Sequence, residues 1–518
     1  MKQIIVALAA AMLCSACVVG PDFKRPDALG AKAYAPAPLP AATASAPQPF
    51  GAAQRFDAGR DVPAQWWTLF RSPTLSRLIE RALAANPTIE AARASLRQAQ
   101  ENVYAQQGYF FPTVQASYGV SRTKVSGNTG GNAPGIQGNG TVISTYQGTP
   151  AAQGGTPPYT APVIYNFHTA ELTVGYTPDV FGGQRRQVES LQAQADAQRF
   201  ELEAADLTIA SNVAAAAIQA ASLRAQLDAT HAMIDAQARS LELVRRQHEL
   251  GYTSGLDVAA AQSALDQLAA NVAPLERQID QTRDLLRVLV GAAQDQDVET
   301  DLALDDFHLP EDLPLSLPSQ LVRQRPDVRA AEAQLHAANA AVGIAIANRF
   351  PQFSISGNVG GNATIFSQMF DSAGKFFALS GQVSHAVFDG GTLKHQQLAA
   401  EAALDAAGAQ YRGTVLVAFQ NVADTLHALH TDAAALETAG RAEQTAKLSL
   451  QLTRRQFELG AVNMQTVLGA EQAYQQAVFA LVQAQASRLG DTAALFEALG
   501  GGWWNRMDGG ETPLRSPG

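Results

Sequence analysis

The sequence predicts a mostly α-helical protein, built from a duplicated unit, in which each copy also supplies two membrane-type β-strands. Two segments carry the helical prediction: residues 184–250 contain no proline or glycine, and residues 392–459 contain no proline. At about 1.5 Å per residue, each helix would be about 100 Å long. Charged and amide side chains interrupt both segments, so neither offers the run of about 20 apolar residues that crosses a membrane. We therefore expect both helices to run through water.

Alternating apolar and polar residues predict four strands, at about 112–122 and 170–181 in the first copy and at about 351–361 and 378–388 in the second. Such an alternation gives a strand one apolar face. In the fourth strand we place Val383 and Val387 on that face. Each segment alone is a weak indication of a membrane barrel, because barrel strands are short and only half apolar.

An internal repeat organises the chain. Residues 86–92 match residues 325–331, Phe111-Pro112 matches Phe350-Pro351, and residues 245–251 match residues 454–460. Each copy then has a short helix, two strands joined by a loop, a very long helix, a tight turn and a returning helix. We assign residues 61–300 to the first copy, residues 301–502 to the second and residues 503–518 to a mobile tail. A loop rich in Gly, Asn and Thr, residues 127–160, lengthens the first copy.

The N-terminus resembles a bacterial lipoprotein signal. A short positive start is followed by the apolar residues 4–13 and by the small residues Ser15-Ala16 before Cys17. We predict that residues 1–16 are removed as a signal peptide and that Cys17 is lipidated. Cys14 stands where such motifs usually carry Leu and remains an alternative acceptor, and an ordinary signal peptide is a further alternative. Residues 17–60 are rich in Pro and Ala, which favours an extended, lipid-bearing strap.

Composition and motifs exclude several classes of function. The formal charge is −10 and no Lys/Arg run is present, so we expect no nucleic-acid partner. No nucleophile motif, zinc motif or phosphate-binding loop occurs, so we expect no enzyme activity, no catalytic residues and no cofactor. His427 and His430 are three residues apart on a predicted helix, but without a third ligand we expect no metal site.

Four strands are too few to close a barrel, because the smallest outer-membrane barrels have about eight strands. An open sheet edge is not tolerated in lipid, so the chain must associate with copies of itself. Two copies would give eight strands and three would give 12, and only the larger barrel leaves room for a conduit. A homotrimer therefore fits transport better than a dimer.

Several short motifs recur in a fixed order along the chain: Cys17 with Val19-Gly20-Pro21-Asp22-Phe23-Lys24-Arg25-Pro26, Trp66-Trp67, Phe70, Pro73-Thr74-Leu75, Leu78-Ile79, Arg325-Pro326-Asp327-Val328, Ala331-Glu332, Ala337-Ala338-Asn339-Ala340 and Phe350-Pro351. Through these residues the chain resembles the TolC/OprM family of outer-membrane efflux proteins, in its lipoprotein branch, over essentially residues 17–502. The resemblance implies a trimeric 12-stranded outer-membrane β-barrel that continues into a long periplasmic α-helical barrel. It also implies a periplasmic adaptor and an inner-membrane resistance-nodulation-division pump as partners, and export of drugs or other small toxic molecules.

Three alternatives to drug export remain. Two lie within the family, where the chain could serve type I protein secretion or metal-ion efflux. The third is a structural coiled-coil envelope lipoprotein, against which the duplicated strand pairs argue. The Cys17 motif followed by Val19-Gly20-Pro21-Asp22 favours the drug-type branch through resemblance.

Candidate site residues fall in two places. Glycines and one acid are expected to bend each strand pair into its long helix: Gly182, Gly183, Asp389, Gly390 and Gly391. The turns that end the long helices are expected to form the periplasmic tip and, by resemblance, to contact the adaptor through Gly251, Tyr252, Gly460 and Ala461. We predict Asp257 as the aperture gate, with Thr466 and Gly469 at the positions where relatives often carry acids, and Glu471 as a weaker candidate.

Overall fold

The computed structural model describes residues 18–26, 33–34, 40–125, 135–136, 142–143 and 163–506. Cys14, Cys17 and most of the loop at 127–160 therefore lie outside the described residues. The chain divides into two compact units. The sheet unit contains Met1–Phe23, Gln100–Ala193 and His336–Asp405, and the helical unit contains Lys24–Ala99, Gln194–Leu335 and Ala406–Gly518.

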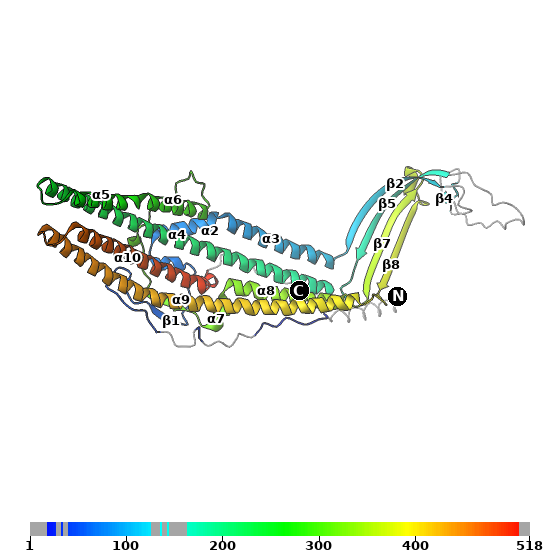
Figure 1. Cartoon of the computed structure of the whole chain (residues 1–518). Coiled ribbons are helices and arrows are strands. Elements are labelled where there is room, and N and C mark those ends of the chain that lie inside the picture. Colours follow the sequence, from blue (N-terminus) through cyan, green and yellow to red (C-terminus); the bar gives the residue numbers. More distant parts are fainter. Residues whose placement is uncertain are drawn as a thin grey trace, which may run out of the picture. The chain divides into compact units, whose positions relative to one another are not determined.

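The sheet unit is built on four antiparallel strands in the order β2-β5-β7-β8 (Figure 1). Their bounds are Thr113–Val125 for β2, Val163–Tyr176 for β5, Gln352–Ala363 for β7 and Lys375–Ser384 for β8. Prolines mark the helix-side ends of these ladders, because proline has no N–H to donate. Pro112 and Pro351 directly precede β2 and β7, and Pro178 follows the end of β5.

The fourth predicted strand is wrong at its end. β8 ends at Ser384, which pairs with Gln352, the first residue of β7. Beyond this pair Pro351 cannot extend the ladder, so Val387 and Phe388 lie outside the sheet and are 97% and 91% exposed. The third strand from the sequence, 351–361, corresponds to β7, and the second, 170–181, corresponds to the helix-side part of β5, which begins earlier and ends at Tyr176.

The strand register gathers the apolar residues onto one face of the sheet. Ala116 pairs with Leu172, Leu172 with Val359, and Val359 with Phe377, so one row crosses all four strands. Large members of this face are exposed within the single chain: Val114, Tyr118, Val120, Leu172, Val174, Val359, Phe377 and Leu379. The next row holds Gln115, Thr173, Asn358 and Ala378 on the opposite face. The sheet is therefore amphipathic, with its apolar face uncovered.

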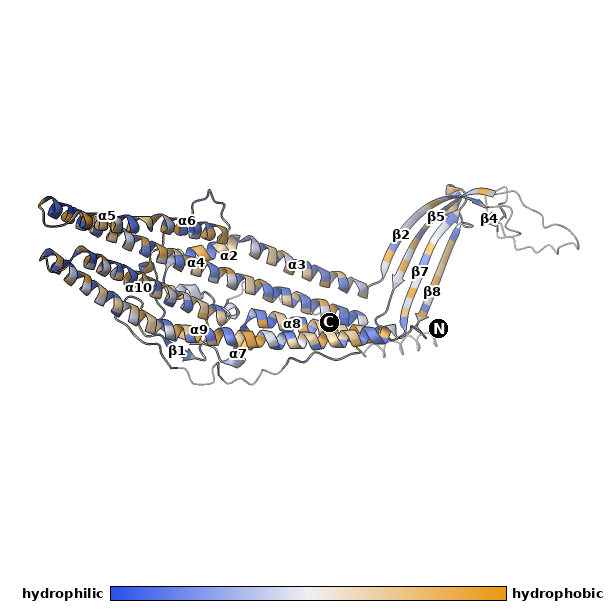
Figure 2. Ribbon diagram, viewed as in Figure 1, coloured by the Kyte–Doolittle hydropathy of each residue, from blue (hydrophilic) through white to orange (hydrophobic). Residues whose placement is uncertain are grey.

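Long helices begin beside the sheet and continue into the helical unit. α4 spans Gly183–Glu249 and α9 spans Thr392–Glu458, each without a break. α3 (Pro87–Gln107) and α8 (Pro326–Ala347) precede the two strand pairs. Orange and blue residues alternate along these ribbons in Figure 2, as expected for helices that bury one stripe. No helix among the described residues is long and apolar enough to cross a membrane.

The two copies return by different helices. In the first copy the chain runs back as α5 (Gly255–Ala270) and α6 (Val272–Leu289), separated at Asn271. In the second copy it runs back as one helix, α10 (Met464–Ala498). α2 (Pro73–Ala85) and α7 (Pro318–Gln324) complete the helical unit, whose aromatic core includes Trp66, Phe70 and Phe496. These aromatic rings are almost fully buried.

The prediction of an extended strap is wrong for its second half. β1 (Arg55–Ala58) pairs in parallel with β6 (Asp312–Leu315). Gln54 is fully buried and its Nε2 donates to Pro310 O and to Thr492 Oγ1, at 3.0 and 2.9 Å. Arg488 Nη2 donates to Thr43 Oγ1 at 3.0 Å. Because polar side chains satisfy this segment, it packs into the helical unit despite its Pro/Ala-rich composition.

The predicted tail also begins too early. Trp503–Asn505 form a short 3-10 helix, and Trp503 Nε1 donates to Gln324 O at 2.7 Å. The ring of Trp503 packs against Phe200 at 5.9 Å between centroids, and Arg506 pairs with Glu203 and Asp206. Residues 503–506 therefore belong to the body, and residues 507–518 lie outside the described residues.

Candidate functional site

An aspartate caps each junction between a strand pair and its long helix. Asp389 accepts hydrogen bonds from the backbone N–H groups of Gly391 and Leu393, both at 2.8 Å. These two bonds hold the pKa of the Asp389 carboxyl below its ordinary value. In the first copy Asp179 accepts from the N–H groups of Gln184 and Arg185, both at 3.0 Å. Each carboxylate thus satisfies unpaired donors at a helix start, where the helix dipole favours negative charge.

The predicted junction glycines lie where the chain bends into the helices. Gly182, Gly390 and Gly391 adopt positive φ values, of 78°, 66° and 91°. Gly183 is the first residue of α4 and has an ordinary φ, so it is not required for the turn itself. Sequence reasoning missed Asp179, because the repeat was aligned on the Gly-Gly pairs. Its position directly before Val180-Phe181-Gly182-Gly183 was the available signal.

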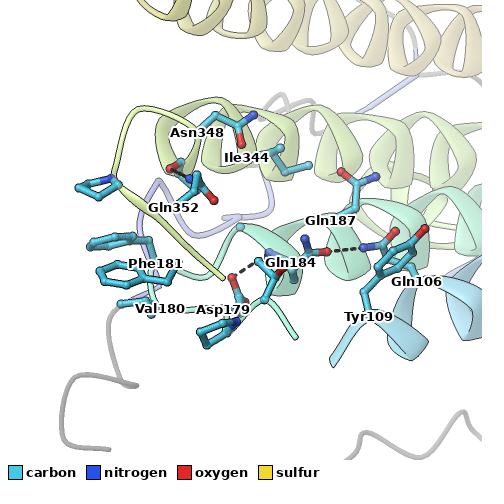
Figure 3. Close-up of a pocket in the computed structure, with 16 residues that line it drawn as sticks. Gln106, Tyr109, Asp179, Val180, Phe181, Gln184, Gln187, Ile344, Asn348 and Gln352 are labelled. Carbon is cyan, nitrogen blue, oxygen red and sulfur yellow. Dashed lines mark hydrogen bonds between the residues drawn. The ribbon is translucent and has the colours of Figure 1, made fainter. Parts of the chain in front are cut away.

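A pocket of about 340 Å³ opens beside the first junction (Figure 3). Amide side chains of α3 and α4, together with Asn348 directly after α8, surround it, and Gln106 Nε2 donates to Gln184 Oε1 at 2.6 Å. Phe181 and Phe353 contribute aromatic rings at one side. The pocket shows that α3, α4, α8 and the sheet meet through polar as well as apolar contacts.

The turn that ends α4 is closed by two backbone hydrogen bonds. Gly251 N–H donates to His248 O at 2.9 Å, and Tyr252 N–H donates to Gln247 O at 2.8 Å. This pair of bonds is the Schellman arrangement, which needs positive φ at the residue after the helix. Gly251 supplies it at 79°, with no neighbouring atom near the place of a Cβ. Tyr252 is 79% exposed at the end of this turn.

The turn that ends α9 repeats the arrangement. Gly460 N–H donates to Phe457 O at 2.9 Å, Ala461 N–H donates to Gln456 O at 2.8 Å, and φ of Gly460 is 71°. A shared cluster of buried side chains joins the ends of α4, α5 and α10: Leu241, Val244, Ala261, Met464 and Val467. Phe457 of α9 packs against this cluster. The sequence therefore placed the four predicted tip residues on two equivalent, exposed turns.

Two gate candidates occupy equivalent positions in the first turns of the returning helices. Asp257 Oδ2 accepts from Ser254 N–H at 3.0 Å, and Ser254 Oγ accepts from Asp257 N–H at 3.3 Å, which forms a capping box. In the second copy Asn463 Oδ1 accepts from Thr466 N–H at 3.1 Å and from Thr466 Oγ1 at 2.8 Å. Asp257 thus helps to cap α5, Thr466 is bound by the cap residue of α10, and the assignment of both to a gate stays a prediction. Gly469 lies on an open side of α10 with nothing near its Cβ position.

Glu471 is placed differently from an acid that faces an open aperture. Its carboxylate is 13% exposed and pairs with Arg454 Nη2 at 2.9 Å. Gln237 of α4 is 1% exposed, and with its amide nitrogen turned toward Glu471 it donates to both carboxylate oxygens. Burial raises the pKa of the Glu471 carboxyl, and Arg454 opposes that rise. These three residues line a groove of about 880 Å³ between the two helix pairs.

His427 and His430 find no third ligand, since the described residues contain no group of three metal-ligating side chains. Burial and the neighbouring His427 lower the pKa of His430. Its ring instead packs against Phe56, with 5.3 Å between centroids. The structure therefore gives this histidine a packing role.

Comparisons with known proteins agree with this architecture. The model of the outer membrane efflux protein family matches residues 78–292 and 317–501, which are the two copies of the repeat. The pyoverdine export outer membrane protein OpmQ of Pseudomonas aeruginosa is 28% identical over 482 residues, covering 93% of this chain and 96% of the relative. The toluene efflux pump outer membrane protein TtgC of Pseudomonas putida is 27% identical over 512 residues, covering 98% and 96%.

Solved structures give the same result. The outer-membrane channel OprN superposes with a TM-score of 0.79 at 27% identity, covering 94% of this chain and 100% of that channel. The outer membrane protein VceC of Vibrio cholerae superposes with a TM-score of 0.72 at 26% identity, covering 85% and 99%. The family predicted from the sequence is confirmed. This chain belongs to the outer membrane efflux protein family.

Proposed function

We propose that three copies of this chain form the outer-membrane duct of a tripartite efflux system. The duct is passive: a periplasmic adaptor and an inner-membrane resistance-nodulation-division pump supply the cargo and the energy. The cargo consists of small toxic molecules such as drugs and solvents, in line with the export of pyoverdine by OpmQ and of toluene by TtgC that their names state. No catalytic step, cofactor or metal is part of this function.

The amphipathic four-stranded sheet is the observation that carries the proposal. Its apolar face is uncovered in the single chain, and among the described residues no strand pairs with the outer edges of β2 and β8. In lipid, such edges must be paired and such a face can meet acyl chains. Edge-to-edge closure of three sheets gives 12 strands, with the polar row of Asn358 turned toward a lumen. The long helices then extend into the periplasm, and a lipid on Cys17 anchors each chain in the membrane.

The tip turns are the proposed contact with the adaptor. Gly251 with Tyr252 and Gly460 with Ala461 are exposed, and backbone hydrogen bonds close both turns. Asp257, Thr466 and Gly469 remain our candidates for the lining of the aperture, which Glu471 is too enclosed to face.

Adjacent residues of β7 test the barrel. Val359 lies in the apolar row and Asn358 in the polar row. Val359→Arg is expected to cost about 2–4 kcal/mol of insertion free energy, as arginine does near the bilayer midplane. Asn358→Arg, the matched control, should insert normally and change only conductance. Equal tolerance of both arginines in outer-membrane fractions would contradict the proposed orientation of the sheet.

Loss of the gene tests the efflux function. With the cognate pump expressed and no substitute duct present, its deletion should raise the accumulation of a fluorescent amphiphile and lower resistance to amphiphilic toxicants. An intact copy should restore both. Unchanged accumulation and resistance in the deletion strain would refute the proposed export function.

A further inference from the structure

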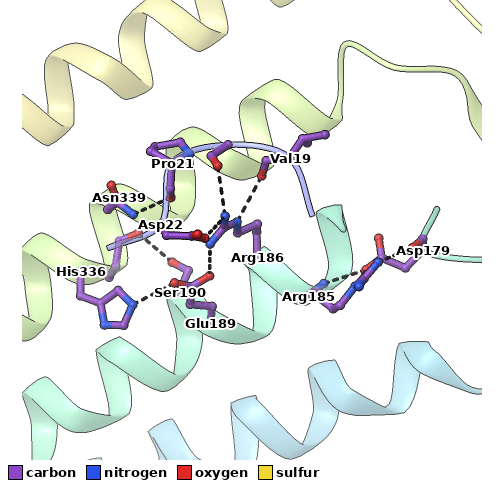
Figure 4. Close-up of polar contacts among 12 residues, drawn as sticks. Val19, Pro21, Asp22, Asp179, Arg185, Arg186, Glu189, Ser190, His336 and Asn339 are labelled. Atoms are coloured by element: carbon purple, nitrogen blue, oxygen red, sulfur yellow. Dashed lines mark hydrogen bonds and ion pairs between the residues drawn. The ribbon is translucent and has the colours of Figure 1, made fainter. Parts of the chain in front are cut away.

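We propose that Arg186 is a positioning residue that clamps the N-terminal segment, and with it the lipid on Cys17, beside the strand-to-helix junction. The inference rests on the lipidation proposed above, and it concerns only the sheet unit. Residues 18–23 have no regular secondary structure, yet polar contacts from α4 and α8 hold them (Figure 4). Val18 is the residue that follows Cys17 in the sequence.

The Arg186 guanidinium is the centre of the clamp. Its side chain is only 4% exposed. Nε donates to Val19 O and Nη2 to Gly20 O, both at 3.2 Å. Nη2 also pairs with Asp22 at 2.8 Å, and Nη1 pairs with Glu189 at 2.7 Å. A planar guanidinium can serve several acceptors in fixed directions, which a lysine ammonium cannot. The arginine therefore fixes both the path and the register of the segment.

α8 supplies the second side of the clamp. Asn339 Nδ2 donates to Pro21 O at 2.9 Å. The ring of Phe23 stacks on His336 with 4.3 Å between centroids, and His336 Nε2 lies 2.9 Å from Glu189 Oε1. These contacts bring Glu189 into the same network as Arg186. Four consecutive residues of the segment, from Val19 to Asp22, are thus bound by side chains of α4 or α8.

Two glycines let the backbones approach. Gly20 has φ of +95°, and a Cβ on it would lie 2.5 Å from Gly343 Cα. A Cβ on Gly343 would in turn lie 2.9 Å from Arg186 Cγ. The two residues before Gly20 lie against the first junction. Val19 N–H donates to Phe181 O at 3.2 Å, and a Cβ on Gly182 would lie 2.9 Å from Val18 Cα. The segment that follows Cys17 is therefore seated against the junction itself.

The clamp exists in only one of the two repeats. Arg186 is the fourth residue of α4, and the fourth residue of α9 is His395, which is exposed. In α3 the residues that match Asn339 and Gly343 are Gln100 and Tyr104. The matching positions of the other repeat therefore lack the arginine and the small glycine, and they carry the longer amide of glutamine in place of asparagine. This departure from the repeat indicates a binding surface selected for the N-terminal segment.

A clamp at this place shortens the free tether of the lipid. A flexible insertion of ten residues has an end-to-end distance of about 17 Å, which would free the acyl chains from the junction. The residues between the acylated cysteine and the clamp form the tether. The effective concentration of the sheet near the membrane falls as this tether lengthens. With the clamp intact, only the insertions on the lipid side of it lengthen the tether; those on the far side do not.

Insertions on either side of the clamp test the inference. Ten Gly/Ser residues are placed after Val18, which leaves the two residues at the acylation site unchanged, or after residue 29 as the matched control. Conversion of pulse-labelled chain into heat-resistant trimer in the outer membrane is measured, with palmitate labelling in parallel. We expect the insertion after Val18 and Arg186→Met each to slow conversion about tenfold, and not additively, while the insertion after residue 29 and His395→Met leave it unchanged.

The outcomes separate the clamp from the lipidation. Equal slowing by both insertions, or by neither, would overturn the clamp, and so would additive slowing by Arg186→Met and the insertion after Val18. Asn339→Leu provides a milder second variant and should show the same pattern if Arg186→Met fails to fold. Absence of palmitate label on the unmodified chain would refute lipidation of this N-terminus, and the clamp with it, while leaving the duct itself untouched.

Discussion

The two tip turns share one backbone and differ in their side chains. Both end a 67-residue helix with a glycine at positive φ and the same two hydrogen bonds. In the first turn, His248 Nδ1–H also donates to Thr253 O at 2.8 Å, and Thr253 Oγ1 donates to Val244 O at 3.3 Å. In the second turn the residue that matches His248 is Phe457, which packs on the buried cluster. The first turn is thus held by polar bonds of its own, and the second by packing.

The side-chain pair that flanks each turn also differs between the copies: it is exposed in the first copy and mostly buried in the second. Arg245 Nη2 donates to Gln262 Oε1 at 2.7 Å on the exposed surface of α4 and α5. The matching residues of the second copy, Arg454 and Glu471, form an ion pair whose carboxylate is mostly buried and is also bound by Gln237. The two copies therefore share the backbone hydrogen bonds of the turn but differ in the side-chain contacts that hold the flanking helices together. The second helix pair depends on a buried charge that links it to α4.

The largest expected difference between the turns comes from the two arginines. Arg454→Met should destabilise the α9–α10 tip by about 2 kcal/mol, because it leaves the mostly buried Glu471 without its cation. Arg245→Met should cost about 0.5 kcal/mol, since its partner is neutral and exposed. Hydrogen exchange of the turn amides measures both. Equal losses of stability in the two variants would show that burial of the Arg454–Glu471 pair does not increase its contribution to stability.

Alanine at the two glycines should affect the turns equally. Gly251→Ala and Gly460→Ala each force a non-glycine residue to a positive φ with open space around its Cβ, at a cost of about 1 kcal/mol. The thermal midpoints of the two variants should therefore fall together. A fall confined to one of them would mean that the backbone of the turns is less alike in solution than their bonds indicate.

The helix caps should give a smaller difference. Ser254→Ala removes the side-chain half of a capping box and should cost about 1 kcal/mol. Asn463→Ala removes one acceptor from Thr466 and should cost slightly less, because no carboxylate is left unpaired. Exchange rates at the N–H groups of Asp257 and Thr466 report each loss separately. A larger loss of exchange protection at the Thr466 N–H than at the Asp257 N–H would contradict the expected ranking of the two caps.

The smallest effect is the pH dependence of the second helix pair. Burial raises the folded-state pKa of Glu471 above its ordinary 4.5, so the folded state binds this proton more tightly than the unfolded state does. The contribution of this proton to the stability of the fold is fully present at pH values below that ordinary pKa. That contribution is lost as the pH rises through the raised value. The midpoint of thermal unfolding should therefore fall over this window, and Glu471→Gln should remove that part of the slope. Glu458→Gln, at an exposed acid of the same helix pair, is the control and should leave the slope unchanged.

The sequence predicted those features that depend on local pattern. The long helices follow from the absence of proline, and the tip and junction glycines follow from their matched places in the repeat. Asp179 was missed because it caps α4 from a place that differs between the copies. The packing of residues 40–58 was missed because it depends on contacts such as Gln54 with Thr492, far apart in sequence. Burial of Glu471 likewise depends on Gln237, which no local pattern connects to it.

We propose above that one chain supplies a third of a closed duct. The most direct test is the native mass of the purified protein in detergent, combined with conductance of the same preparation in planar bilayers. We expect a mass of three chains and discrete conducting units, because strand edges such as those of β2 and β8 must be paired in lipid. A monomer that conducts nothing, or a stable assembly of two chains, would contradict it.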